Sequence, residues 1–277
     1  MTARVLVALE DAETAEALLD AAVRLAAYRR AELLGLYIEE SAFLDALALP
    51  FARTFRDTAR GWERAAPAEL ERAFRLRAEA LQRRLEHAAA RMQVTWNFSV
   101  RRGTPAAQLA EAGRPDDLLV LGAGRRSVWH ARPGSTAASL AARGASACLV
   151  LRPGITGGVA ALFDGDPAVL AAAAEVARTE EARLIVAVLG VSAAAQAERA
   201  EAARTWLTAH GLAAEIQMLP AHDPAAACRA LAALHPGTAV VTRGAAERWL
   251  GDGAGLLNTV PCTWLFLPEA ESASARP

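Results

Sequence analysis

The chain contains two copies of one sequence pattern, and this duplication constrains its fold more strongly than any other feature. Each copy opens with a short apolar run that ends in an acid. A proline-containing segment, an apolar stretch of helical character and a second apolar run then follow in the same order. The matching segments are residues 4–11 and 158–165, 103–107 and 222–226, and 117–124 and 238–244. A repeat this long exceeds the roughly 20 to 50 residues of solenoid repeats, so it indicates a duplicated domain.

Length and composition agree with two globular domains. The chain has 277 residues, which is enough for two domains of ordinary size. Hydrophobic residues make up 53% and charged residues 22%, as is typical of a chain that forms a core. The formal net charge of −1 gives no support for nucleic-acid binding, which usually needs a strongly basic face.

The absence of lysine excludes three kinds of chemistry. All 30 basic residues are arginine. The chain therefore lacks a phosphate loop that ends in Gly-Lys, a kinase-type catalytic lysine and any lysine that forms a Schiff base.

Neither a membrane segment nor a cysteine framework is indicated. No apolar run reaches the roughly 18 residues of a membrane-spanning helix. The first residues lack the features of a signal peptide, so we expect a cytoplasmic protein that contacts no membrane. Cys148, Cys228 and Cys262 include no CxxC pair, which favours buried thiols over disulfides or a structural metal.

Short apolar runs alternate with helical patterns in both copies. This alternation predicts an α/β fold of two tandem doubly wound domains, each with a mostly parallel five-stranded sheet flanked by helices. The expected strands are residues 4–9, 33–38, 94–101, 118–121 and 148–151 in the first copy, and 159–163, 183–189, 214–219, 238–241 and 263–267 in the second.

The predicted domains are residues 1–152 and 159–268, joined by a Pro-Gly-rich linker at 153–158 and followed by a disordered tail at 269–277. A long, largely helical insertion, residues 41–93, interrupts the first domain. Two interpretations of it remain open. It is a hairpin or lid that packs on its own sheet, or it is a surface for a partner protein or a second copy of the chain.

A glycine-rich loop in the first copy leaves a strand and enters a helix. Glycines let backbone N–H groups approach a phosphate closely, and a helix N-terminus adds further unpaired N–H groups. The loop follows the carboxyl end of a parallel strand, where open α/β sheets bind ligands. The loop residues that we expect near a phosphate are Gly122, Gly124, Arg125, Arg126, Gly134, Ser135 and Thr136.

The whole pattern resembles the universal stress protein family in its tandem two-domain form. The matching features are the short strand that ends in an acid, Gly103-x-Pro105 before a helix, Leu-Val-Leu-Gly at 119–122, Gly-x9-Gly-Ser at 124–135, and Cys-Leu-Val-Leu at 148–151. The resemblance covers residues 3–152 and 158–268, apart from the insertion. It implies a role in the stress response and a site for ATP or AMP in the first domain, with Mg²⁺ if the ligand is ATP. Glu10 would face the ribose or adenine, and Ile38 would flank the base.

Each copy departs from the family pattern in a different place. In the first, one residue separates Gly122 from Gly124, where the family has two, and Asp11 follows the acid Glu10, where the family has a glycine. In the second, Asp164-Gly165 matches, but the expected loop at 243–255 lacks the Gly-Ser and carries two acids. We therefore expect the second copy to be a structural partner that binds no nucleotide.

Three functions remain open from the sequence. The first is a binding or signalling module without catalytic residues, which binds an adenine nucleotide in the first domain only. The second is an interaction scaffold of the same fold that has lost nucleotide binding. The third is a slow metal-dependent ATPase. The resemblance also implies an intramolecular pseudo-dimer through residues 149–151 and 263–267, and we expect a homodimer or a protein partner at the insertion.

Overall fold

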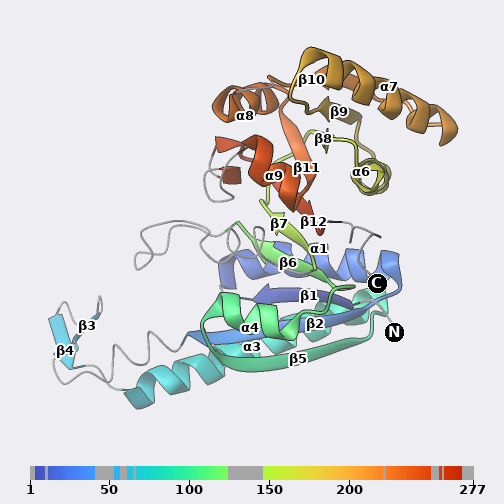
Figure 1. Cartoon of the computed structure of the whole chain (residues 1–277). Helices are drawn as coiled ribbons and strands as arrows, with labels where there is room; N and C mark the ends of the chain where they lie inside the picture. The colour runs from blue at the N-terminus through green and yellow to red at the C-terminus, as the bar shows by residue number, and fades with distance from the viewer. Residues whose placement is uncertain are drawn as a thin grey trace, which may run out of the picture. The chain divides into compact units, whose positions relative to one another are not determined.

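A computed structural model describes residues 4–9, 12–40, 53–56, 61–64, 67–123, 146–220, 223–250, 256–257 and 259–269. The chain divides into two compact units, residues 1–120 and 121–277, and each is described by itself (Figure 1). The ten strands of the main sheet are the five that the sequence predicts in each copy, so the predicted α/β class is confirmed. Among the described residues, no helix is both long and apolar enough to span a membrane.

The first unit is built on a parallel sheet whose strands follow the order β6-β1-β2-β5. Its elements are β1 (Arg4–Leu9), α1 (Ala12–Arg29), β2 (Glu32–Glu40), β5 (Trp96–Gly103), α4 (Pro105–Ala112) and β6 (Leu118–Gly122). Val5, Leu6 and Val7 are fully buried, because β1 has a neighbour on each side and helices cover the sheet. A strand buried on both faces needs a continuous apolar sequence, as these residues have.

Within the described residues of the insertion, a pair of short strands precedes a long helix. Strands β3 (Arg53–Arg56) and β4 (Gly61–Arg64) form an antiparallel pair. Helix α3 (Pro67–Met92) follows. Its residues Ala78, Leu81, Leu85 and Ala89 are buried, since they recur at the spacing of one helix face.

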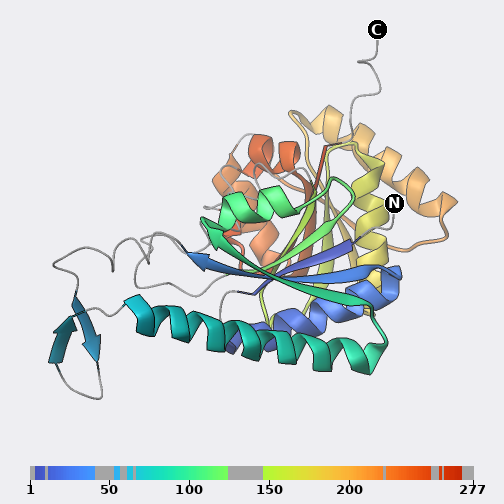
Figure 2. The same ribbon diagram turned by 90° about the horizontal axis from the view of Figure 1, so that it is seen from below.

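Helices α1 and α3 cover one face of this sheet, and α4 lies on the other face (Figure 2). The close approach of α3 to β2 depends on Gly35. A Cβ atom at this position would lie 2.7 Å from Cδ2 of Leu85 and 3.1 Å from Cδ2 of Phe98. Leu85 is fully buried, so a side chain at position 35 would require this packing to rearrange.

The second unit has the strand order β10-β9-β8-β11-β12-β7. All pairs in this unit are parallel except β12 with β7. Its elements are β7 (Ala147–Leu151), β8 (Gly158–Phe163), α6 (Pro167–Thr179), β9 (Leu184–Val188), α7 (Ala193–Ala209), β10 (Glu215–Met218), α8 (Pro224–Ala233), β11 (Pro236–Thr242), α9 (Arg243–Leu250) and β12 (Thr263–Leu267). The sequence predicted each strand to within two residues, but it did not predict α9, which occupies most of the expected loop at 243–255.

The last strands of the two copies pair with each other. Val150 is opposite Trp264, and Cys148 is opposite Phe266, in antiparallel register. This pairing was expected from the resemblance, whereas a pseudo-dimer of two domains stays a prediction. It explains why β7 groups with the second unit, so that the division falls at residue 120 and not at the linker. Of the predicted tail, only Glu269 lies within the described residues.

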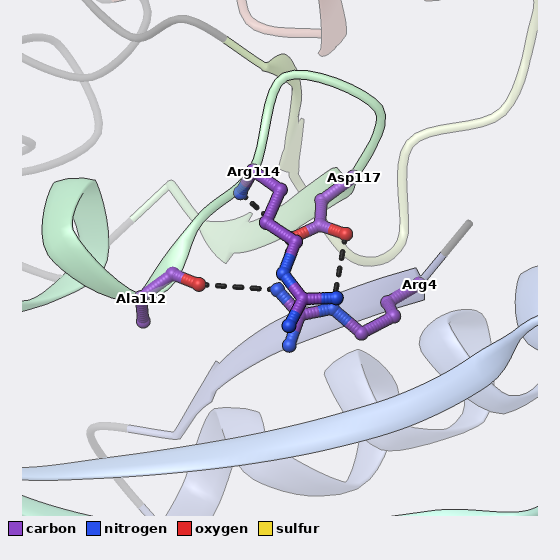
Figure 3. Close-up of polar contacts among 4 residues, drawn as sticks. All are labelled: Arg4, Ala112, Arg114 and Asp117. Atoms are coloured by element: carbon purple, nitrogen blue, oxygen red, sulfur yellow. Dashed lines mark hydrogen bonds and ion pairs between the residues drawn. The ribbon is translucent and has the colours of Figure 1, made fainter. Parts of the chain in front are cut away.

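A charged cluster fixes the amino end of the first unit's sheet (Figure 3). At the start of β1, Arg4 donates through Nε to Oδ1 of Asp117 at 3.1 Å and through Nη2 to Oδ2 at 2.6 Å. The same guanidinium reaches the carbonyl of Ala112, the last residue of α4, at 3.2 Å. The backbone N–H of Arg114 also donates to Asp117, at 2.8 Å. These bonds join β1, α4 and the turn before β6, and they raise the pKa of Arg4.

We expect Arg4→Ala to lower the free energy of unfolding by about 3 kcal/mol, because it leaves the carboxylate of Asp117 without its charged partner. The Asp117 side chain is only 2% exposed, so water cannot replace the lost bonds well. Denaturant unfolding followed by circular dichroism measures the change.

The matched control is Arg204→Ala, which removes an exposed ion pair to Glu201 within α7. An exposed pair of this kind contributes at most about 1 kcal/mol. Equal losses in the two variants would contradict a structural role for the Arg4 cluster.

Candidate functional site

The candidate site of the first unit lies at the carboxyl ends of its strands. From β1 the chain crosses over to β2 on one side, while β6 pairs with β1 on the other side. The order of strands therefore changes direction at β1, which creates a topological switch point. Open α/β sheets bind ligands there, beyond the carboxyl ends of the strands.

The structure places two of the predicted site residues. Ile38 lies near the carboxyl end of β2 and is half-buried. Gly122 is the last residue of β6. The other predicted residues lie outside the described part of the chain, and they are Glu10, Gly124, Arg125, Arg126, Gly134, Ser135 and Thr136.

Charged residues that the sequence analysis did not single out lie beside Ile38. Arg102 of β5 donates through Nε and Nη2 to Oε2 of the buried Glu39, at 3.1 and 2.9 Å. Arg101 lies 3.7 Å from Glu111 of α4. Glu39-Glu40 and Arg101-Arg102 are adjacent pairs of opposite charge in the sequence. Their contacts can be predicted only once β2 and β5 are known to be neighbours.

At the corresponding place in the second unit, an ion pair joins the end of β8 to α9. Asp164 directly follows β8, and the next residue, Gly165, has a φ of +117°, which only glycine adopts readily. Arg248 of α9 donates through Nη2 to Oδ2 of Asp164 at 2.9 Å. The carboxylate of Asp164 is 10% exposed, so the chain's own arginine neutralises an acid that has little access to solvent.

Two side chains of α7 donate hydrogen bonds to backbone carbonyls just beyond the neighbouring strands. Gln196 donates through Nε2 to the carbonyl of Leu219 at 2.5 Å. Arg199 donates through Nη1 to the carbonyl of Leu189 at 2.7 Å, and its guanidinium lies 6.0 Å from the centre of the Trp249 ring. Helix α9 begins at Arg243, immediately after β11, so no glycine loop separates the strand from the helix. Side chains of α7 and α9 thus contact the chain directly after β8, β9 and β10.

Metal-type clusters do not form within the described ranges. No group of three or more His, Cys, Asp or Glu comes together there as a metal site would require.

The three cysteines are free and buried. Burial raises the pKa of both Cys148 and Cys262 to about 12, against a partial lowering by Arg243 and Arg152 respectively.

Comparisons with known proteins identify the fold. No family model matches the chain, and no curated protein matches it. Its structure is similar to that of a universal stress protein from Archaeoglobus fulgidus DSM 4304, with a TM-score of 0.67, 10% identity, and 96% of this chain and 97% of that chain covered.

Two structures from Pseudomonas aeruginosa are similar over the same share of this chain. One, from strain UCBPP-PA14, is assigned as a universal stress protein, with a TM-score of 0.58, 18% identity, and 96% of this chain and 93% of that chain covered. The other, from strain PAO1, is a protein of unknown function, with a TM-score of 0.57, 18% identity, and 96% and 92% covered. At these identities the likeness shows the fold: the chain has the fold of universal stress proteins along nearly its whole length, as the sequence predicted.

The high pKa of the buried thiols gives a test by pH. We expect Cys148 and Cys262 to resist alkylation by iodoacetamide at pH 9, because a thiol with a pKa of about 12 is protonated there and the thiolate is the nucleophile. In denaturant, both should react rapidly. Mass spectrometry of the labelled protein counts the modified cysteines.

Stability should change over the same pH range. Above about pH 9 the unfolded chain loses thiol protons that the folded chain retains, so the free energy of unfolding should fall as the pH rises toward 12. A Cys148→Ala/Cys262→Ala double variant should show a shallower fall. An identical pH dependence in both proteins, or rapid native labelling at pH 9, would contradict this assignment.

Proposed function

We propose that the chain is a universal-stress-type binding or signalling module that binds an adenine nucleotide, ATP or AMP, in its first copy only. The observation that supports this is the difference between the two switch points. In the second unit, Arg248 neutralises Asp164 and α9 begins directly after β11. In the first copy, the strand that ends at Gly122 continues into a sequence with glycines and a Gly-Ser pair at the spacing of a phosphate-binding loop.

Each proposed contact follows from the chemistry of the ligand. Glu10 would accept hydrogen bonds from the ribose hydroxyls or the adenine amino group, and Ile38 would pack against the base. Backbone N–H groups of the glycine loop would donate to phosphate oxygens, with Ser135 or Thr136 capping the helix that follows. The residues proposed to surround the phosphates are Gly122, Gly124, Arg125, Arg126, Gly134, Ser135 and Thr136. Mg²⁺ would accompany ATP, held mainly by the phosphates themselves.

We favour a binding role over catalysis, because the sequence assigns no nucleophile or general base. Phosphoryl transfer to water needs a group that orients the attacking water and a metal that neutralises developing charge. Glu10 and Asp11 are the nearby candidates for orienting a water.

We further propose a cytoplasmic location and a pseudo-dimer of the two copies, supported by the pairing of β7 with β12.

We expect freshly purified protein to release close to one adenine nucleotide per chain, and Gly134→Asp to abolish this binding. The new carboxylate would repel the phosphates, and its side chain would prevent close backbone approach. Losing a single charge-assisted hydrogen bond of about 1.5 to 3 kcal/mol already weakens binding roughly tenfold or more. Mass spectrometry of released small molecules and calorimetric titration with ATP and AMP measure both effects.

Gly253→Asp is the matched control, because it makes the same substitution after α9 in the second copy. It should leave stoichiometry and affinity unchanged. Wild-type protein that gives no heat with ATP or AMP up to about 1 mM, an affinity weaker than about −4 kcal/mol, would instead identify the chain as an interaction scaffold. Phosphate release that depends on Mg²⁺ and is lost in Gly134→Asp would identify an ATPase.

A further inference from the structure

An arginine that the proposed site does not include lies next to Ile38. Strands β2 and β5 are parallel and in register, and Ile38 of β2 is directly opposite Arg101 of β5. Register partners in a parallel pair direct their side chains to the same face of the sheet, with strands about 4.8 Å apart. Arg101 is therefore the cross-strand neighbour of the residue proposed to flank the base.

The two faces of the sheet at this point are distinguished by independent contacts. Gly35 faces α3, because a Cβ atom there would meet Leu85. Glu39 is four residues further along β2, so it shares this face and binds Arg102 there. Arg101 faces the opposite way, toward α4, where it lies 3.7 Å from Glu111. Arg101 and Arg102, adjacent on β5, therefore lie on opposite faces of the sheet.

On the α4 face, Arg101 and Ile38 are more exposed than their neighbour Leu36. Leu36, two residues before Ile38 on the same face, is only 1% exposed, whereas Ile38 and Arg101 are both half-buried. The carboxylate partner of Arg101 holds it weakly, since Glu111 is 70% exposed and the separation is at the long end for an ion pair. The guanidinium can therefore exchange this contact for a ligand.

We infer that Arg101 binds the base of the nucleotide by stacking its guanidinium on the purine ring. This inference rests on the proposed function. Strand β5 is the third strand from β6 in the order β6-β1-β2-β5, so Arg101 lies about 14 Å from the strand that leads into the phosphate loop. That separation assigns Arg101 to the base end of the ligand. A planar guanidinium suits this position, because it attracts the face of an aromatic ring and stacks on it.

The test is a calorimetric titration of the full chain with AMP, ADP and ATP. Arg101→Ala should weaken the binding of all three by the same factor, about fivefold. Arg101→Lys should recover only part of the affinity, because an ammonium group keeps the charge and loses the flat surface. Arg102→Gln is the matched control on the opposite face: its amide can still donate to Glu39, and it should bind all three nucleotides as wild type does.

Each outcome separates this inference from the proposed function. If Gly134→Asp abolishes binding while Arg101→Ala binds as wild type does, the proposed function stands and the role of Arg101 is overturned. A loss that grows from AMP to ATP would place Arg101 at the phosphates and also overturn the inference. Equal losses in the Arg101 and Arg102 variants would indicate a general charge effect and overturn it too. A wild-type chain that binds none of the three nucleotides overturns both proposals.

Discussion

The pairing of β1 with β2 on one side and β6 on the other places the switch point of the first unit's sheet. A parallel strand in the middle of a sheet is buried on both faces, and Val5, Leu6 and Val7 have no exposed surface. Because its interior is closed, β1 leaves only its two ends accessible. The crossover to β2 and the return through β6 open the sheet at the carboxyl end, and this is where doubly wound folds place their ligands.

Each unit has an ion pair between an arginine and an aspartate at one end of its strands. At the amino end of the first unit, Arg4 and Asp117 are almost entirely satisfied by each other and by neighbouring backbone, which locks β1 to α4 and β6. At the carboxyl end of the second unit, Arg248 and Asp164 form an internal pair of the same chemical type. A carboxylate that already has its own arginine gains little from a ligand's hydrogen-bond donors.

The insertion shows how a small residue in one element positions a distant one. Helix α3 packs on β2 through Leu85, and Gly35 leaves the space that Leu85 needs. On the same face, Glu39 and Arg102 pair near the carboxyl ends of β2 and β5. Arg101 and Ile38 lie on the other face, beside α4, and both side chains are half-buried.

The sequence by itself determined the α/β class, the duplication and each strand of both copies to within two residues, because apolar runs and helical periodicity are local properties of the chain. Of the predicted site residues, Ile38 lies two residues before the end of β2 and Gly122 is the last residue of β6. Tertiary structure decided what depends on neighbours that are distant in sequence. The register of β2 and β5 decided that Arg101 accompanies Ile38 while Arg102 binds Glu39. The packing of α9 on β11, the neighbour of β8 in the sheet, decided that Arg248 reaches Asp164, across 84 residues of chain. An isolated sequence pattern cannot determine such pairs, because a charge is equally compatible with solvent, a ligand or a partner until the fold brings one of them within hydrogen-bonding distance.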